Sequence, residues 1–449
     1  MHLAIIGGVA AGSKAAARAR RVNLDIAITL YQDEAEVSYT ACGQPYHLSG
    51  LIPKREALII RHPDDFAAEG IDVRINHRVQ RINTSERTLS VQDFERNKTS
   101  EVSFDRLIIA TGARSVVPEI PGCRLDGVVT LRSLAELDRF RSTLERLQPR
   151  TAVIVGSGYI GLEMAESLSA LGLSVTLLAR NRQVFSRLDA DMSCVIHDYL
   201  VAQNVKVIAG DKVTEFAGHA GRVEHVVTDS GLRLPADLVV LALGIRPNVE
   251  LAEQAGIRLG ETGAIAVDER METDLEGVFA AGDCAESRHR ITDRPIWDPL
   301  GDIANLHGRV AGENAAGGEA RFPGVFGTAI FKTFELNVGL TGLTELAARA
   351  AGFEPVSVVI SARDKARYYP GARELSLKLV AEAKGGRLLG AQAVGTGAVD
   401  KTIDIAAMAL LGHLHCRDLE NADLAYAPPF SPVLSPIIVA AGALGKKIG

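Results

Sequence analysis

Two glycine-rich turns constrain the fold of this chain more than any other feature. The first is Gly7-Gly8-Val9-Ala10-Ala11-Gly12 and the second is Gly156-Ser157-Gly158-Tyr159-Ile160-Gly161. Each turn stands between a short apolar stretch and a helical pattern, and this order is typical of a unit that binds a dinucleotide at the helix N-terminus. The apolar stretches are residues 2–6 and 152–155, and the helical patterns are residues 12–21 and 162–171.

Two such units predict two bound nucleotides and an α/β fold with two Rossmann-like domains. Two further strand ends belong to the first unit, into which the second unit is inserted. They are residues 107–110, which Thr111-Gly112 follow, and residues 278–283. From about residue 324 the pattern changes to strands and one long helix, which predicts an α+β third domain. The predicted boundaries are 1–115 with 245–322 for the first domain, 116–244 for the second and 323–449 for the third.

Composition excludes several classes of function. The 449 residues include 49 Lys and Arg against 55 Asp and Glu, so no basic surplus favours nucleic acid or an anionic membrane. The longest apolar stretch near the C-terminus, residues 436–444, is about half of the ~20 residues that span a bilayer. The five cysteines form no Cys-x-x-Cys pair, which excludes a zinc ribbon and fits a reducing cytosol. We expect a soluble cytoplasmic protein with no metal, membrane or nucleic-acid partner.

The residue after the second strand of each unit bears on nucleotide choice. An Asp or Glu there holds the ribose and repels a 2′-phosphate. In the second unit this place reads Ala179, followed by Arg180 and Arg182, so we expect NADPH to be preferred over NADH; the alternative is that these arginines are solvated surface charges. In the first unit Gln32 replaces the acid, and its amide oxygen can still accept a hydrogen bond. Asp283, after a glycine at a strand end, is placed to bind a ribityl or ribose hydroxyl; the alternative is an Asp that caps the next turn.

Residues 38–46, Ser-Tyr-Thr-Ala-Cys-Gly-Gln-Pro-Tyr, form the most specific motif. The chain here resembles the single-cysteine branch of the FAD-dependent pyridine nucleotide–disulfide oxidoreductases, which includes coenzyme A-disulfide reductase, NADH peroxidase, NADH oxidase and persulfide reductase. The resemblance covers the whole chain and implies an FAD domain, an inserted NAD(P)H domain and a C-terminal dimerisation domain. Its further motifs are Thr111-Gly112, GYIGLE at 158–163, GDCAE at 282–286, residues 305–309, YYPG at 368–371, Asp400-Lys401 and AYAPP at 425–429.

Cys42 is the predicted redox-active residue, and the alternative is a buried structural cysteine. A sulfur near a helix N-terminus and a flavin is stabilised as the thiolate, which opens a disulfide by forming a mixed disulfide. The resemblance implies that electrons pass from NADPH through FAD to this sulfur. Tyr368 and Tyr426 match tyrosines that reach toward the sulfur from the partner subunit of a homodimer, where a phenol can protonate the departing thiolate.

The resemblance also assigns the remaining site residues. Tyr159 covers the nicotinamide pocket and moves aside for the cofactor, while Glu163 makes a structural hydrogen bond or takes part in catalysis. The expected substrate contacts are Arg18, Arg21 and Ser38, which match positions that bind coenzyme A, and His307. The expected cofactor-binding residues are Gly7, Gly8, Ala10, Ala11, Gly12, Gln32, Asp33, Val79, Thr111, Gly112, Gly156, Gly158, Tyr159, Ile160, Gly161, Glu163, Arg180, Gly244, Gly282 and Asp283.

The expected function is NADPH-dependent reduction of a small-molecule disulfide or persulfide. Coenzyme A is one candidate thiol, but two family lysines are absent near residues 68–70 and 431–434, so glutathione, cysteine and polysulfide stay open. An NADH oxidase or peroxidase with Cys42 as a sulfenic acid is an alternative; those enzymes carry a His where this chain has Ala10. Another alternative is an electron carrier or redox sensor that serves a protein partner.

Overall fold

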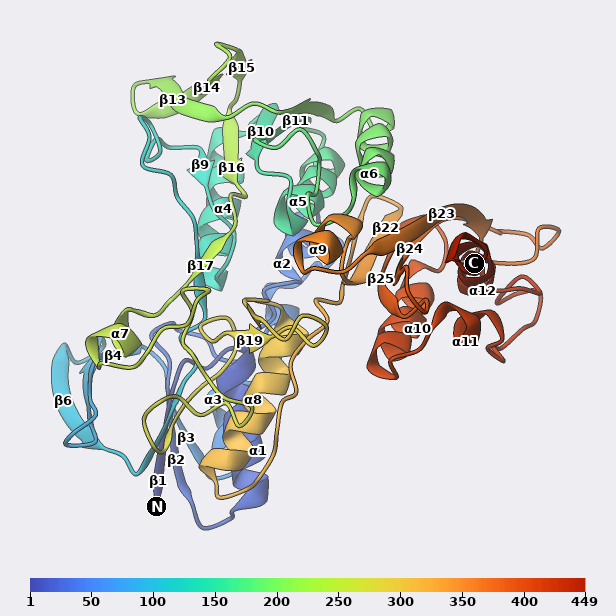
Figure 1. Cartoon of the computed structure of the whole chain (residues 1–449). Helices are drawn as coiled ribbons and strands as arrows, with labels where there is room; N and C mark the ends of the chain where they lie inside the picture. Colours follow the sequence, from blue (N-terminus) through green and yellow to red (C-terminus); the bar gives the residue numbers. More distant parts are fainter. Residues whose placement is uncertain (449) are drawn as a thin grey trace. The chain divides into compact units, whose positions relative to one another are not determined.

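The computed structural model describes residues 1–448 (Figure 1). These residues divide into two compact units. Unit 1 comprises Met1–Val116, Leu131–Ser142 and Gly244–Val325. Unit 2 comprises Val117–Thr130, Thr143–Leu243 and the residues from Phe326 onward. The finer division into three domains, with the boundaries given above, stays a prediction.

Unit 1 is built on a five-stranded parallel sheet with the order β18-β7-β1-β2-β3. β1 pairs with β2 on one side and with β7 on the other. Leu3, Ala4 and Ile5 of β1 are fully buried, as expected for a parallel strand that is covered on both faces. The strands are β1 (His2–Ile6), β2 (Ala27–Tyr31), β3 (Ile71–Arg74), β7 (Arg106–Ile109) and β18 (Val278–Ala280).

Two helices pack closely in this unit: α1 (Ala10–Val22) and α8 (Gly301–Ala315). The contact is so close that a Cβ added to Gly308 would lie 2.2 Å from the Ala11 carbonyl oxygen, which explains the small residues of both helices. The other elements of unit 1 are α2 (Gln44–Leu48), η1 (Arg55–Leu58), α3 (Pro63–Ala67), β4 (His77–Asn83), β5 (Thr88–Asp93), β6 (Lys98–Ser103), β8 (Ala113–Ser115), β17 (Ile245–Pro247), α7 (Glu250–Gln254), β19 (Ser287–Arg288) and β20 (Pro295–Ile296).

Unit 2 contains a second parallel sheet, with the order β12-β11-β10-β16-β9. A small antiparallel sheet, β13-β14-β15, accompanies it. The elements are β9 (Val128–Val129), β10 (Thr151–Val155), α5 (Tyr159–Ala170), β11 (Ser174–Ala179), α6 (Ala190–Ala202), β12 (Lys206–Ala209), β13 (Val213–His219), β14 (Arg222–Thr228), β15 (Arg233–Pro235) and β16 (Leu238–Leu241). Helix α4 (Leu134–Leu147) begins in unit 1 and ends in unit 2.

The rest of unit 2 is an antiparallel sheet, β21-β22-β25-β24-β23, with helices packed on it. The apolar C-terminal stretch forms α12, which buries Ile437, Ala440, Ala441 and Leu444; this spacing gives one apolar helix face. The elements are β21 (Ala329–Thr333), β22 (Leu336–Gly342), α9 (Glu345–Ala350), β23 (Pro355–Arg363), β24 (Glu374–Glu382), β25 (Leu388–Gly395), α10 (Val399–Leu411), α11 (Cys416–Glu420) and α12 (Pro436–Ile448).

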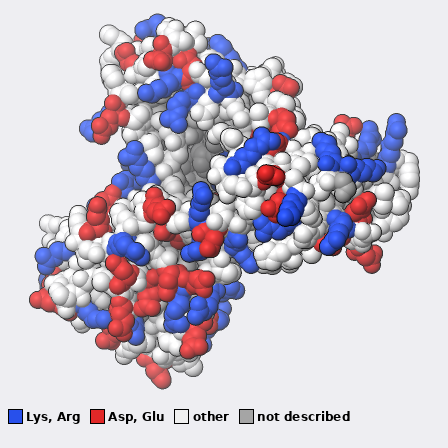
Figure 2. Space-filling model, in the orientation of Figure 1, with Lys and Arg blue, Asp and Glu red and all other residues white. Residues whose placement is uncertain are grey.

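These elements confirm the predicted fold class of two Rossmann-like parallel sheets and an α+β part. The helices after the glycine turns begin earlier than predicted, α1 at Ala10 and α5 at Tyr159, because the second half of each turn is already helical. Within residues 1–448, every helix is too short or too polar to serve as a membrane span. Acidic and basic side chains are interspersed over most of the face drawn in Figure 2, in keeping with the small net charge.

Candidate active site

The first glycine turn lies at the carboxyl edge of the unit 1 sheet. Gly7 directly follows β1, Gln32 directly follows β2, and Thr111 and Gly282 come two residues after β7 and β18. Parallel strands present their carboxyl ends at one edge, which is where open α/β sheets bind nucleotides. Because α1 begins at Ala10, inside the turn, the N–H groups of its first turn are available to a phosphate.

Gln32 is buried, and both ends of its amide are engaged within the protein. Its Oε1 accepts a hydrogen bond from the Gly8 N–H at 2.7 Å, and its Nε2 donates to Glu34 Oε2 at 3.1 Å. The sequence predicts that Oε1 accepts a hydrogen bond from a ribose hydroxyl. In the structure this oxygen already accepts one hydrogen bond from the glycine turn. Asp33 beside it is exposed and forms an ion pair with Arg78 at 3.2 Å.

Three more predicted cofactor residues belong to unit 1. Val79 is buried in β4 and pairs with Val91. Thr111 donates from Oγ1 to the Asn248 carbonyl oxygen at 2.6 Å, and Asn248 returns a bond from Nδ2 to the Thr111 carbonyl oxygen at 2.8 Å. The Gly112 carbonyl oxygen also accepts a hydrogen bond from the Asn248 N–H. Asn248 therefore fixes the backbone that follows β7.

Asp283 forms an ion pair with Arg132, a residue that the sequence does not single out. The side chains are 11% and 30% exposed, respectively, so the pair lies largely inside the protein. Trp297 donates from Nε1 to the Asp283 carbonyl oxygen at 2.8 Å. Arg132 stands in no motif of the sequence, so no sequence signal identifies it; the structure assigns it to unit 1 through the short segment of residues 131–142.

Cys42 is exposed and lies in a turn directly before α2. Its segment is held on both sides: the Ser38 N–H donates to the Gly8 carbonyl oxygen at 2.7 Å, and Gln44 Nε2 donates to the Arg132 carbonyl oxygen at 3.1 Å. Ser38 has a φ of +52°, an unusual backbone conformation for a residue other than glycine and one that clusters at functional sites. The thiol is therefore tied to the edge of the sheet where the first glycine turn lies.

A half-buried carboxyl group strengthens this attachment. Glu34 Oε2 accepts from the Tyr39 hydroxyl at 2.7 Å and from Gln32 Nε2 at 3.1 Å. Burial raises the pKa of Glu34, and the Tyr39 hydrogen bond opposes that rise. Tyr39 precedes Cys42 by three residues, so the glycine turn, Gln32 and the cysteine segment form one hydrogen-bonded group.

The predicted substrate residues on α1 differ in their surroundings. Arg18 donates to Glu313 Oε2 from Nε at 2.9 Å and from Nη2 at 2.5 Å, whereas Arg21 is exposed. Ser38 is 8% exposed and contributes its backbone N–H to the glycine turn. Among these residues Arg21 has its charge most open to solvent.

His307 requires a correction, because it is 1% exposed and does not present its ring to a substrate. Its Nδ1 accepts from the Gly282 N–H at 3.4 Å, and its Nε2 lies 2.9 Å from Ser287 Oγ. Burial lowers the pKa of His307 to about 3, so the ring is neutral near pH 7. The residue supports the backbone before Asp283 instead of contacting a ligand.

The second glycine turn follows β10 at the carboxyl edge of the unit 2 sheet. Gly156 has a φ of +117°, and a Cβ there would lie 2.1 Å from the Ala242 carbonyl oxygen. A Cβ added to Gly158 would meet nothing within 4 Å, which leaves the open space that a pyrophosphate requires. Ile160 and Gly161 lie in the first turn of α5, so their N–H groups stand at the helix N-terminus.

The residues that follow the neighbouring strands carry no acid. Ala179 ends β11, and Arg180 and Arg182 after it are exposed. Gly244 follows the end of β16 by three residues. Two exposed guanidinium groups therefore lie just beyond the end of β11, where a nucleotide ribose is expected in this fold.

Tyr159 and Glu163 lie one turn apart on α5, and both are partly buried. The Tyr159 ring contacts the rings of Phe185 and Phe331, which sequence reasoning does not identify. Neither phenylalanine stands in a recognisable motif, and Phe331 comes from a distant part of the chain.

Tyr368 and Tyr426 come from two separate loops of the C-terminal part and meet on its surface. The two side chains are hydrogen-bonded, and this bond is the main cause that raises the pKa of Tyr426. They are 76% and 48% exposed, respectively. The structure therefore brings together the two tyrosines that the sequence pairs by role.

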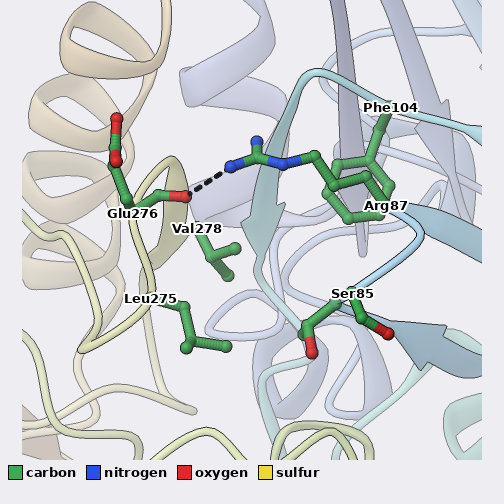
Figure 3. A pocket seen from close by; sticks show the side chains of 7 residues that line it. Ser85, Arg87, Phe104, Leu275, Glu276 and Val278 are labelled. Atoms are coloured by element: carbon green, nitrogen blue, oxygen red, sulfur yellow. Dashed lines mark hydrogen bonds between the residues drawn. The ribbon is translucent and has the colours of Figure 1, made fainter.

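A surface cavity of about 210 Å³ in unit 1 lies apart from these residues (Figure 3). Arg87 donates to the Glu276 carbonyl oxygen there at 3.2 Å. None of the predicted site residues lines this cavity, so we assign it no part in the chemistry. The cavity is lined by Thr84, Ser85, Arg87, Phe104, Leu275, Glu276 and Val278.

Among residues 1–448, no group of three or more His, Cys, Asp or Glu side chains is placed to hold a metal ion.

The residues present fit two dinucleotides. In unit 1 the α1 N-terminus offers N–H donors to a pyrophosphate, and Asp283 offers a carboxylate to a hydroxyl group. The buried Oε1 of Gln44 accepts no hydrogen bond from residues 1–448, which fits a bound group that supplies a donor. Two dinucleotide sites, with an exposed thiol beside the first, define a flavin- and nicotinamide-dependent oxidoreductase.

Comparison with known proteins gives the family. Residues 1–297 match the pyridine nucleotide-disulphide oxidoreductase family, and residues 328–436 match the dimerisation domain of the same family. The chain belongs to the pyridine nucleotide-disulphide oxidoreductases, which confirms the resemblance drawn from the sequence. Membership implies FAD and NAD(P)H as cofactors.

Three similar proteins cover nearly the whole chain. An NAD(P)H sulfur oxidoreductase (CoA-dependent) of Pyrococcus abyssi is 41% identical over 442 residues, which are 98% of this chain and 97% of the relative. An NADH oxidase of Methanocaldococcus jannaschii is 35% identical over 453 residues, 100% of this chain and 99% of the relative. The solved structure of an NAD-dependent persulfide reductase from A. fulgidus is 40% identical, with a TM-score of 0.96, and the match covers 100% of this chain and 83% of that one.

Proposed function

We propose that the protein uses NADPH to reduce a small-molecule disulfide or persulfide through Cys42. The observation that carries this proposal is the exposed thiol on a segment that hydrogen-bonds to Gly8 and, through Gln44, to Arg132, the partner of Asp283. The names of the P. abyssi and A. fulgidus proteins, a sulfur oxidoreductase and a persulfide reductase, support the same chemistry.

The chemistry at Cys42 is thiol–disulfide exchange. FAD, when bound, supplies the relay for two electrons between the nicotinamide and the sulfur. The Cys42 thiolate attacks one sulfur of the substrate, a new S–S bond forms, the substrate S–S bond breaks, and one thiol leaves with a proton. Two electrons and a proton then release the second thiol and restore the thiolate. One disulfide, one NADPH and one proton thus give two thiols and NADP⁺.

We infer that Tyr368 and Tyr426 act across the interface of a homodimer. A tyrosine keeps its proton near pH 7 at its ordinary pKa, and the hydrogen bond between the two residues raises the pKa of Tyr426 further, so this phenol is a proton source for a departing thiolate. Exposed apolar groups favour burial against a second copy of the chain, and the dimerisation-domain match supports this pairing. The exposed apolar side chains of the C-terminal part include Met408, Leu411, Leu414, Phe430, Val433, Leu434 and Val439.

We propose NADPH as the preferred reductant, on the strength of Arg180 and Arg182 after Ala179. Both guanidinium groups are exposed at the end of β11, and no carboxylate occupies the place that would repel a 2′-phosphate. The A. fulgidus protein is named as NAD-dependent. The proposed preference for NADPH therefore rests on Arg180 and Arg182 of this chain and not on that relative.

Coenzyme A is the substrate thiol we propose first. The P. abyssi relative is named as CoA-dependent, and the exposed Arg21 on α1 offers a cation to a phosphate group. Glutathione, cysteine and polysulfide differ from coenzyme A in lacking its phosphates, so mutation of Arg21 separates the classes.

An NADH oxidase is the second candidate, favoured by the name of the M. jannaschii relative. In that reaction Cys42 cycles through a sulfenic acid. The first glycine turn carries Ala10 where the resemblance leads one to expect a histidine in such enzymes, which favours the reductase.

Mass spectrometry of the NADPH-reduced holoenzyme after addition of coenzyme A disulfide tests the proposal. We expect the peptide containing Cys42 to carry one coenzyme A thiol, while Cys194, which is also exposed, stays unmodified. A sulfenic acid on Cys42 after exposure to oxygen, with no thiol adduct, supports the oxidase. An unmodified Cys42 under both conditions contradicts both candidates.

A further inference from the structure

The Tyr159 ring is held by three side chains of unit 2. Its centroid lies 4.9 Å from that of Phe185 and 5.2 Å from that of Phe331, with interplanar angles of 72° and 87°. Edge-to-face pairs at such distances are attractive beyond the burial of their area. The Arg187 guanidinium lies over the same ring, 5.6 Å from its centroid. We call Phe185, Phe331 and Arg187 the tyrosine seat.

Phe331 reaches the ring from β21, a strand that is fixed against α5. Thr333 Oγ1 donates to the Leu162 carbonyl oxygen at 2.9 Å, and Lys332 Nζ donates to Glu166 Oε1 at 3.0 Å. Phe331 is 7% exposed. Because two side-chain bonds join the strand to the helix, Phe331 cannot follow the tyrosine ring when that ring moves.

Phe185 belongs to the loop that joins β11 to α6 and that begins with Arg180. It is 2% exposed and has a φ of +53°, which is strained for a bulky residue and persists only where the surroundings enforce it. The loop ends at Asp189, whose Oδ2 accepts from Gln392 Nε2 at 2.7 Å and lies 3.2 Å from Nζ of the buried Lys378. This end of the loop is therefore anchored on the antiparallel sheet.

We infer that Phe185 and Phe331 are positioning residues that set the affinity for NADPH by fixing the free-energy cost of displacing Tyr159. The inference rests on the proposed function and on the expectation from the family resemblance that Tyr159 covers the nicotinamide pocket and moves aside for the cofactor. If a ligand binds only the protein whose Tyr159 ring is displaced, its apparent affinity is proportional to the fraction of protein in that state. Weaker contacts between Tyr159 and the tyrosine seat raise this fraction. Removing one aromatic ring of the seat therefore tightens cofactor binding.

The test compares Phe331→Leu with Phe216→Leu in the holoenzyme. Phe331→Leu keeps an apolar side chain and removes the aromatic edge, whereas Phe216 is a fully buried residue of β13 outside the tyrosine seat. By calorimetry we expect Phe331→Leu to bind NADP⁺ about 2- to 12-fold more tightly, the factor that corresponds to one edge-to-face pair. Phe216→Leu should bind it as the wild type does.

A ligand without nicotinamide provides the second control. 2′-Phospho-ADP-ribose needs no displacement of Tyr159, so Phe331→Leu should bind it with unchanged affinity. In a Tyr159→Ala background, Phe331→Leu should no longer alter the affinity for NADP⁺. Phe185→Leu carries the same expectations and replaces Phe331→Leu if that variant does not fold.

Two results overturn the inference. One is NADP⁺ binding that is unchanged or weaker in Phe331→Leu, and the other is equal tightening for both ligands. Neither measurement involves Cys42, so a failure of disulfide reduction in the Cys42 experiments is distinguished from a failure here.

Discussion

Gln44, which follows Cys42 by two residues, donates a hydrogen bond from its side-chain amide to the Arg132 carbonyl oxygen at 3.1 Å. Arg132 in turn pairs with Asp283 at the end of β18. The contacts link the predicted redox-active thiol to the strand end where a dinucleotide hydroxyl is expected. A change at Asp283 should therefore disturb the cofactor site beside the sulfur.

Asp283→Asn should weaken FAD binding. The substitution removes the carboxylate expected to accept from FAD and leaves the Arg132 guanidinium without its partner. A hydrogen bond to a charged group contributes about 1.5–3 kcal/mol, so the dissociation constant should rise at least about tenfold. The single Trp297, which donates to the Asp283 carbonyl oxygen, should report FAD binding to the apoprotein through fluorescence quenching.

The matched control is Glu250→Gln. This substitution breaks the ion pair with Arg114, in which both side chains are 51% exposed, and such surface pairs contribute little. FAD affinity should be unchanged in the control. Equal affinity in Asp283→Asn and the wild type would remove the carboxylate from the cofactor site.

Arg180→Glu should shift cofactor preference toward NADH. The change removes a cation exposed at the end of β11 and adds a carboxylate that repels the 2′-phosphate. The ratio of kcat/KM for NADPH to that for NADH should fall at least about tenfold, the size expected for one charge-assisted bond. Arg233→Glu, at an exposed position on β15, should keep the wild-type ratio. An unchanged ratio in Arg180→Glu refutes the phosphate site.

Tyr426→Phe should slow thiol release more than reduction of the flavin, because the lost phenol is the proposed proton donor. Stopped-flow measurement of the two half-reactions separates these rates. The neighbouring Tyr369→Phe supplies the control, since Tyr369 is 37% exposed and has no proposed role. Equal slowing of both half-reactions would remove Tyr426 from the proton-transfer step.

Tyr368→Phe should change the pH dependence of thiol release. The Tyr368 hydrogen bond raises the pKa of Tyr426, and the raised value keeps the phenol protonated to higher pH. Without that bond the pKa falls, so the loss of rate on the alkaline side should begin at lower pH. An alkaline limb that stays in place in Tyr368→Phe would contradict this assignment.

The fold could be predicted because its signals are local. Each glycine turn, with the apolar strand before it and the helix after it, falls within about 30 residues, and the sequence identifies both Rossmann-like units. The motif around Cys42 and the pairing of Tyr368 with Tyr426 were also accessible, but only through resemblance. Even these local signals misplaced the helix starts, because the second half of each turn is helical.

The contacts around the site could not be predicted, because they depend on tertiary packing. Arg132 meets Asp283 and Phe331 meets Tyr159 across more than a hundred residues of sequence, and no periodicity records such contacts. His307 was assigned to substrate from a motif, whereas its burial against Gly282 and Ser287 is visible only in three dimensions.

The central claim, that electrons reach the substrate through the sulfur of residue 42, is tested by separating the half-reactions of Cys42→Ser. Cys194→Ser, which removes another exposed thiol, is the control and should behave as the wild type. We expect NADPH to bleach the flavin of Cys42→Ser at close to the wild-type rate, while turnover of the disulfide falls by at least about a thousandfold. Full disulfide reductase activity in Cys42→Ser would contradict the central claim.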